Sequence, residues 1–245
     1  MIAFLGMYDM PHAAAAYDRF WAAIRADLGT GPSDLSRDVD PWAVWPSPDL
    51  LLAQTCGLPY RARLFDDVTL VGTPDYGLRD CPRGYYFSYV IKRRGDARNL
   101  TTLARSGTLA YNEPLSQSGW AAPFAHLAGK GMHANATLQT GAHRASAEAV
   151  VDQRADYAAI DAITFQMWNS AAPDLCAGLD AFVRTKPTPG LPFITAKGRD
   201  PAPIARAVTR AIEGLDPADR DVLMLQGLEQ IDADTYRALP IPPMP

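Results

Sequence analysis

Cysteine and histidine, the residues that build most metal sites, are scarce in this sequence. Its 245 residues include three cysteines and four histidines. The cysteines show no spacing typical of metal ligands and the histidines are scattered, so we expect no metal site. Cys56 and Cys81 each follow a strand-like segment and could form a disulfide, the alternative being two thiols. Such a bond would indicate an oxidising compartment.

Excess positive charge and long hydrophobic runs are also lacking. The formal net charge of -4 gives no electrostatic basis for binding nucleic acid or an anionic membrane. No apolar run approaches the roughly 20 residues of a membrane span. The N-terminus lacks the basic and apolar parts of a secretory leader, and residues 1–8 are typical of a first strand. We therefore expect a periplasmic protein if a leader was removed or mis-called, and a cytoplasmic protein if the chain as given is full length.

What the sequence does contain is an alternation of short apolar strands and amphipathic helices. With 48% hydrophobic and 20% charged residues, the chain can bury one large core or two smaller ones. The alternation predicts an α/β fold with largely parallel sheets, and there is no repeat of fixed period. Strands are predicted at residues 2–7, 50–55, 68–73, 86–91, 108–112, 136–140, 156–161, 181–183 and 191–195. Helices are predicted at residues 13–28, 58–64, 100–105, 119–128, 144–153, 162–170, 203–215 and 217–230, before a proline-rich end.

Two loops suggest domain boundaries. Proline and glycine punctuate the chain near residues 83–86 and again at 186–190. We expect a first lobe made of residues 1–85 and 186–245, and a second lobe, residues 86–185, inserted into it through two hinge crossings. Ligands of open α/β sheets collect at the carboxyl ends of strands, so this layout predicts a cleft between the lobes. The alternative is one continuous sheet.

The run from Asn112 to Trp120 is the most informative stretch of the chain. It is typical of a strand end that leads into a helix through Ser116, Gln117, Ser118 and Gly119. Unpaired helix amides and two serine hydroxyls at one place form a natural site for an anion. The alternative is an ordinary helix cap, in which the serine oxygens accept from the first amides of the helix.

Polar residues after other predicted strands point to the same cleft. His143 could add a donor whose charge depends on pH, and Asp161 could accept a proton-bearing oxygen or hold a ligand ammonium group. Each also has a structural interpretation, His143 as an exposed residue at a helix start and Asp161 as a helix cap, while the tyrosines could serve packing alone. Together these groups could enclose a tetrahedral oxyanion. The expected ligand-binding residues are Tyr8, Gln54, Thr55, Tyr76, Ser116, Gln117, Ser118, Gly119, His143 and Asp161.

Ser118, His143 and Asp161 are also the residue types of a nucleophilic triad. No Gly-x-Ser-x-Gly elbow surrounds either serine, and a serine at a helix start beside other donors is better placed to bind than to attack. We therefore expect no catalytic residue and no cofactor.

At these positions the chain resembles the phosphate, phosphite and phosphonate substrate-binding proteins of ABC transporters, a branch of the type II periplasmic-binding-protein fold. The resemblance covers nearly the whole chain. It rests on Met7-Tyr8-Asp9, Leu52-Ala53-Gln54-Thr55-Cys56-Gly57, Val71-Gly72-Thr73-Pro74, Ser116-Gln117-Ser118-Gly119, Gly141-Ala142-His143-Arg144, Ala158-Ala159-Ile160-Asp161 and Pro189-Gly190-Leu191-Pro192.

The resemblance implies roles for the candidate residues. In this family the turn matching residues 116–119 wraps phosphonate or phosphite oxygens, and residues matching His143 and Asp161 complete the cage. Tyrosines similar to Tyr8 and Tyr76 close over the ligand from the other lobe. Gln117, between the serines, and Trp120, where tyrosine is usual, depart from the family pattern and bear on which phosphonate is bound.

The implied function is that of a solute-binding protein. It would trap phosphate, phosphite or a phosphonate in the interlobe cleft by hinge closure, as a monomer, for uptake through an ABC transporter permease. Two alternatives stay open: a cytosolic enzyme of the same fold, resembling menaquinone-pathway enzymes, that acts on a small carboxylated substrate, and a cytosolic ligand sensor.

Overall fold

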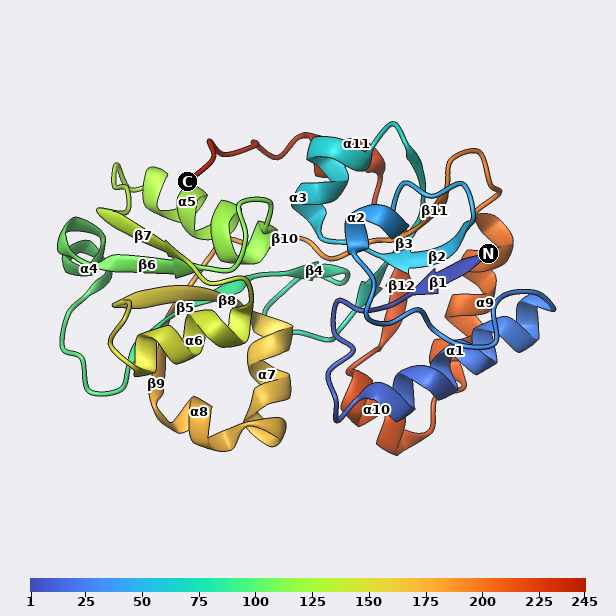
Figure 1. The fold of residues 1–245 in the computed structure, drawn as a ribbon, viewed down its shortest axis with the longest axis horizontal. Helices are drawn as coiled ribbons and strands as arrows, with labels where there is room; N and C mark the ends of the chain where they lie inside the picture. Colours follow the sequence, from blue (N-terminus) through green and yellow to red (C-terminus); the bar gives the residue numbers. More distant parts are fainter. The chain divides into compact units, whose positions relative to one another are not determined.

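The computed structural model describes all 245 residues and divides them into two compact units (Figure 1). The first unit contains residues 1–85 and 189–239, and the second contains residues 86–188 and 240–245. The last six residues thus group with the second unit, whereas the sequence assigned them to the first. Trp120 explains part of this placement, because its indole Nε1 donates to the carbonyl oxygen of Pro243 over 2.9 Å.

The first unit contains a mixed five-stranded sheet in the order β1-β2-β11-β3-β12. Its strands are β1 (Ile2–Phe4), β2 (Leu50–Gln54), β3 (Val68–Asp75), β11 (Phe193–Ala196) and β12 (Gly227–Glu229). β1 is parallel to β2, and β11 runs antiparallel between β2 and β3. Strands β1, β2 and β3 therefore share one direction, and their carboxyl ends lie at one edge of the sheet.

Helices with apolar stripes cover this sheet. α1 buries Tyr17, Phe20, Trp21 and Ile24, a spacing that follows the 3.6-residue turn, and it packs against α9. The helices of the unit are α1 (Ala14–Leu28), α2 (Pro41–Val44), α3 (Gly57–Pro59), η1 (Tyr60–Leu64), α9 (Ala202–Glu213), α10 (Pro217–Leu223) and α11 (Ala233–Arg237). A further apolar cluster, which includes Trp45, Tyr60 and Ile194, is buried within this unit.

The second unit has its own five-stranded sheet in the order β7-β6-β8-β5-β9. Its strands are β5 (Ser88–Arg93), β6 (Thr108–Tyr111), β7 (Ala136–Gln139), β8 (Tyr157–Asp161) and β9 (Leu179–Arg184). β6 is parallel to both β7 and β8, whereas β5 is antiparallel to β8 and β9. The segments after β6, β7 and β8 therefore begin at one edge of the sheet.

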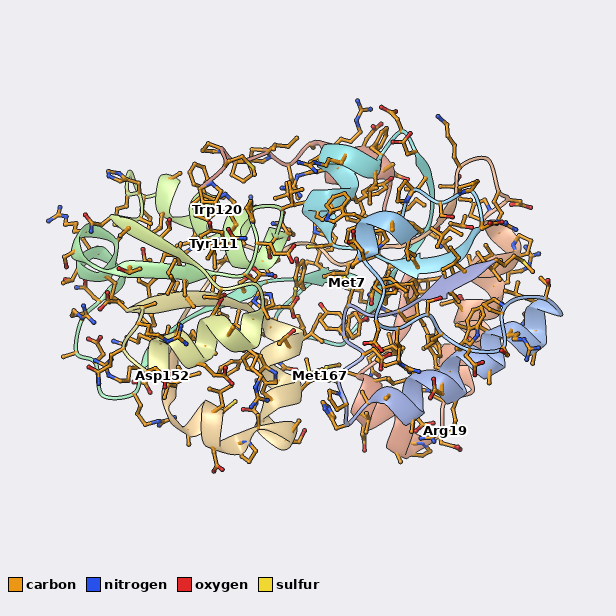
Figure 2. All side chains as sticks on the ribbon, viewed as in Figure 1. Met7, Arg19, Tyr111, Trp120, Asp152 and Met167 are labelled. Carbon is orange, nitrogen blue, oxygen red and sulfur yellow. The ribbon has the colours of Figure 1, made fainter.

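Six helical segments surround that sheet: α4 (Leu100–Ser106), η2 (Gln117–Ala121), α5 (Ala122–Ala128), α6 (His143–Val151), α7 (Ala162–Ala171) and α8 (Pro173–Ala177). The core of the unit contains Leu103, Leu109, Tyr111, Trp120 and Tyr157. The rings of Tyr111 and Trp120 lie side by side, 5.2 Å between centroids, next to the anion-binding turn predicted from the sequence (Figure 2).

The segments that link the units pair with each other as a two-stranded sheet of β4 (Tyr85–Tyr86) and β10 (Thr188–Pro189). The predicted α/β class is confirmed, but the prediction of largely parallel sheets is wrong, because β5, β11 and β12 run antiparallel to a neighbour. The helix predicted to reach residue 230 ends at Leu223, where Met224 adopts the left-handed conformation with φ 58°, and β12 follows. The sequence patterns also did not predict α2, α8 and α11.

Of the two alternatives for Cys56 and Cys81, a disulfide or two thiols, the structure has two thiols. Cys56 is buried at the start of α3, whereas Cys81 is half-buried in the loop between β3 and β4. No group of histidine, cysteine and acidic side chains is placed to hold a metal ion, and no helix is long and apolar enough to cross a membrane.

Candidate functional site

The second unit brings two of the predicted ligand-binding residues into direct contact. Ser118 Oγ lies 2.8 Å from Nε2 of His143. Ser118 belongs to η2, which follows β6, and His143 opens α6, which follows β7. Because β6 and β7 are parallel neighbours, with Tyr111 opposite Gln139, the loops that leave them begin side by side.

The two serines of the turn have different roles. Ser116 caps η2, because its Oγ accepts from the amide of Gly119 at 2.9 Å, and its carbonyl oxygen accepts from the amides of Trp120 and Ala121. Capping, the structural alternative from the sequence, therefore holds for Ser116. Its hydroxyl hydrogen can still be donated to a ligand. The amide of Ser118 lies in the first turn of η2, where helix geometry supplies no acceptor.

The electrostatics of this cluster depend on His143. Burial lowers the pKa of His143 to about 4, so the imidazole is neutral near pH 7. Its Nδ1 is buried and has no partner. In the tautomer with hydrogen on Nε2, His143 donates to Ser118 Oγ, and the hydroxyl hydrogen of Ser118 is free to bond an anion. In that tautomer the contact orients a hydroxyl donor.

Asp161 is tied to its own helix. The carboxylate is buried at the end of β8, and its Oδ1 accepts from the amides of Ile163 at 2.7 Å and Thr164 at 3.0 Å. It thus caps α7, the structural role that the sequence offered as the alternative. Its predicted contact with a ligand stays a prediction.

Ser88 supports the turn, and the sequence gave no sign of this role. Its side chain is buried on β5 and donates to the carbonyl oxygen of Ser118 at 2.9 Å. Gln117 is buried in the same turn, and its Nε2 lies 3.5 Å from Thr188 Oγ1. A lone serine in a strand carries no signal of such a contact, because the contact depends on which loop crosses above it.

The first unit gathers its predicted residues at the carboxyl ends of β1, β2 and β3. The rings of Tyr8 and Tyr76 meet edge to face, 5.1 Å between centroids. Gln54 Nε2 donates to the Tyr76 hydroxyl at 2.9 Å and to the carbonyl oxygen of Leu191 at 3.2 Å. Gln54 Oε1 and Thr55 Oγ1 are buried without a partner. The strand-end prediction therefore brings together residues distant in sequence.

Tyr17 and Asp9 extend this first-unit cluster. Burial raises the pKa of Tyr17, with Tyr76 and Asp9 adding to the effect. Arg37 holds Asp9 through an ion pair of 2.6 Å. Tyr17 was not predicted, because its position in α1 is that of an ordinary core residue.

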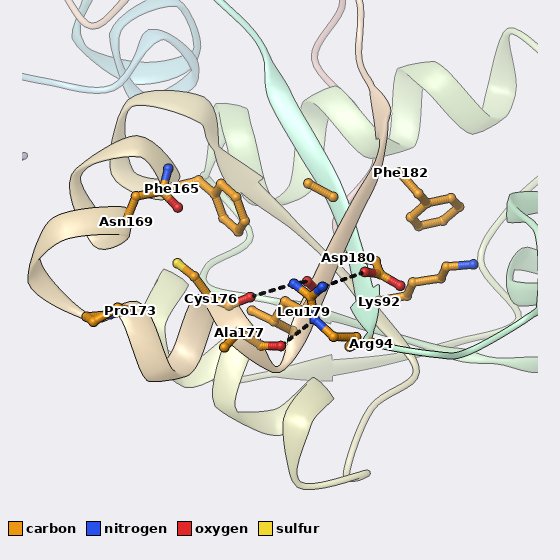
Figure 3. A pocket seen from close by; sticks show the side chains of 11 residues that line it. Lys92, Arg94, Phe165, Asn169, Pro173, Cys176, Ala177, Leu179, Asp180 and Phe182 are labelled. Atoms are coloured by element: carbon orange, nitrogen blue, oxygen red, sulfur yellow. Dashed lines mark hydrogen bonds and ion pairs between the residues drawn. The ribbon is translucent and has the colours of Figure 1, made fainter.

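A separate cavity of about 670 Å³ lies on the second unit beside β9, α7 and α8 (Figure 3). Its two cationic side chains are engaged within the protein. Arg94 donates to the carbonyl oxygens of Ala177 and Leu179, and Lys92 donates to the carbonyl oxygen of Arg98. None of the predicted ligand-binding residues lines it, so it is distinct from the Ser118 cluster.

A family model described as "ABC transporter, phosphonate, periplasmic substrate-binding protein" matches residues 52–236. The chain belongs to this family. The match includes the turn, His143 and Asp161, and it confirms the resemblance that the sequence motifs indicated. The phosphonate-binding family consists of substrate-binding proteins of ABC transporters rather than enzymes, so the predicted class is confirmed.

Solved structures show the same two-lobed periplasmic-binding-protein fold. A binding protein component of an ABC phosphonate transporter from Pseudomonas aeruginosa is 14% identical, with a TM-score of 0.72 over 96% of this chain and 82% of its own. PhnD1 of Prochlorococcus marinus in complex with methylphosphonate is 15% identical, with a TM-score of 0.71 over 91% and 89%. A Xanthomonas citri protein bound to ATP is 16% identical, with a TM-score of 0.67 over 92% and 91%. No curated protein matches the chain.

Proposed function

We propose that the protein is a monomeric periplasmic receptor that binds phosphate, phosphite or a small phosphonate and delivers it to an ABC transporter permease. The observation that carries the ligand class is the contact between Ser118 and His143 at a helix start. Family membership supports the transport role.

The chemistry of the second-unit cluster suits a tetrahedral oxyanion. The Ser118 hydroxyl, the Ser116 hydroxyl and the Ser118 amide are donors within one short turn. None of these donors is a fixed cation, so recognition of the anion depends on hydrogen-bond geometry. Hydrogen bonds to a charged acceptor are stronger than those between neutral groups, so neutral donors can hold an oxyanion. Asp161, Tyr8, Tyr76, Gln54 and Thr55 stay candidate contacts.

Calorimetric titration of phosphate, phosphite, methylphosphonate and 2-aminoethylphosphonate tests the proposal. We expect at least one of them to bind at a 1:1 ratio. Ser118→Ala should weaken that binding by about 1.5–3 kcal/mol, the usual contribution of a hydrogen bond to a charged group. Ser106→Ala, an exposed serine on α4, is the matched control and should bind as the parent does. Absence of binding to all four ligands, or equal affinity in Ser118→Ala and the parent, would overturn the proposal.

A further inference from the structure

We propose that Asn112 is a further ligand-binding residue of this site and donates a hydrogen bond from its carboxamide nitrogen to the bound oxyanion. This inference rests on the proposed function and adds a residue that the strand-end prediction did not assign.

Asn112 lies between the two loops that form the cluster. It directly follows β6, and its carbonyl oxygen accepts from the amide of Gly141 at 3.0 Å, two residues before His143. The residues that follow Asn112 lead within four positions to Ser116. The backbone of Asn112 is thus fixed from the His143 side and continues into the serine turn.

The side chain of Asn112 lies against Gly119. A Cβ placed on residue 119 would stand 1.9 Å from Asn112 Oδ1 and 3.0 Å from its Cγ. No side chain fits at that distance, so the carboxamide occupies the space that glycine leaves open. The same Cβ would stand 3.2 Å from Ser116 Oγ. The carboxamide of Asn112 therefore lies beside the capping hydroxyl of the turn.

Neither end of this carboxamide has a hydrogen-bond partner within the protein. Oδ1 is buried and unpaired. Nδ2 also makes no hydrogen bond to the protein, and it is accessible to solvent. A buried side-chain oxygen such as Oδ1 normally has a partner, whereas Nδ2 is open to water or to a ligand. A ligand oxygen in front of the turn would accept from Nδ2.

The chemistry of a carboxamide fits this position. It is a neutral donor whose hydrogens are present at every physiological pH, which complements the serine hydroxyls. A carboxylate of the same shape would place negative charge beside a bound anion and would have no hydrogen to donate. The exchange of asparagine for aspartate therefore keeps the shape of the side chain, removes the hydrogen-bond donor and adds a negative charge.

Calorimetry with the ligand that the parent binds tests this assignment. Asn112→Ala should weaken binding about 10-fold and Asn112→Asp about 100-fold or more, because the first removes a donor and the second adds repulsion. Asn169→Ala, an exposed asparagine on α7, is the matched control and should bind as the parent does. The melting temperature of the ligand-free Asn112→Asp variant, which keeps the shape, verifies folding. Parent-like affinity in both Asn112 variants would overturn the assignment, while loss of affinity in Ser118→Ala alone would keep the proposed function.

A second pair of variants separates ligand contact from packing. Gly119→Ala should lower the melting temperature, and adding Asn112→Ala should restore much of it, because the new Cβ enters the space left by the carboxamide. Affinity should stay low in the double variant. Recovery of parent-like affinity would show that Asn112 only fills space and would overturn the assignment, and no recovery of stability would contradict the contact on which it rests.

Discussion

The two units present different chemistry at equivalent edges of similar sheets. In each unit, three parallel strands end at one edge, with antiparallel strands beside them. At that edge the second unit places hydroxyls, helix amides and an imidazole, whereas the first places two tyrosines in edge-to-face contact and the buried, unpaired side-chain oxygens of Gln54 and Thr55. Topology thus decides where a site can form, and the loop residues decide which ligand it suits.

The difference also concerns how polar groups are partnered. In the second unit Ser116 and Asp161 cap η2 and α7, so one loop residue and one strand-end residue hold helix starts in place. In the first unit α1, the helix after β1, begins without a side-chain cap, and Tyr76 is held by Gln54 instead. We infer that side-chain caps hold η2 and α7 at the second-unit edge, although α6 has no such cap, and that aromatic packing organises the first-unit edge.

The largest effect expected from a substitution at neutral pH comes from removing a buried cap in the second unit. Asp161→Ala leaves the amides of Ile163 and Thr164 without an acceptor and should lower the free energy of unfolding by about 1–2 kcal/mol. Asp161→Asn keeps an acceptor oxygen and should cost less than about 0.5 kcal/mol. The matched control is Asp40→Ala, which removes the exposed cap of α2 in the first unit and should cost less than Asp161→Ala.

Urea unfolding measures these differences, and titration of the oxyanion on the same variants separates two roles of Asp161. Loss of affinity in Asp161→Asn at unchanged stability would show that the carboxylate also contacts the ligand, as the sequence predicted. A cost for Asp40→Ala equal to that of Asp161→Ala would contradict the contrast in capping between the units.

An effect of a different kind is expected at acid pH, and it concerns His143. The pKa of His143 in the folded protein, about 4, lies below the ordinary value of 6.5. The unfolded chain therefore binds more protons between these values, and the stability gained from the neutral imidazole is complete above pH 6.5 and is lost as the pH falls towards 4. His143→Asn should remove this part of the slope.

Unfolding free energies of the parent and His143→Asn at several pH values between 4 and 7 test this expectation. Carboxylates titrate in both proteins, so the difference between the two curves isolates the histidine. That difference should change most between pH 6.5 and 4. A constant difference across this range would contradict the lowered pKa.

Part of this architecture could be predicted from the sequence and part could not. The apolar run of β8 and the helical stripe of α1 are clear in the sequence, and the strand-end rule predicted both Ser118 and His143, whose side chains lie 2.8 Å apart. The antiparallel insertion of β11 between β2 and β3 left no local signal, because its apolar run is the same for either direction. The left-handed Met224 that ends α10 carries no glycine signature.

The same limit applies to individual residues of the site. Ser88, Tyr17 and Asn112 gain their contacts from segments far away in the sequence or from a glycine whose close approach only the folded chain reveals. Strand-end residues could be predicted because parallel strands bring their ends together whatever the loops do. Residues that support the loops depend on packing, which period and spacing do not encode.

The smallest effect is expected from removing one buried tyrosine hydroxyl in each unit. Tyr76→Phe keeps the ring contact with Tyr8 but removes the oxygen that accepts from Gln54, and it should cost about 1 kcal/mol of unfolding free energy. Tyr157→Phe in the second unit removes a buried hydroxyl that has no partner, and it should be neutral or stabilising. Urea unfolding of the two variants measures the difference. An equal loss of unfolding free energy in both would show that the hydrogen bond between Gln54 and Tyr76 adds nothing to the stability of the first unit beyond the packing of the rings.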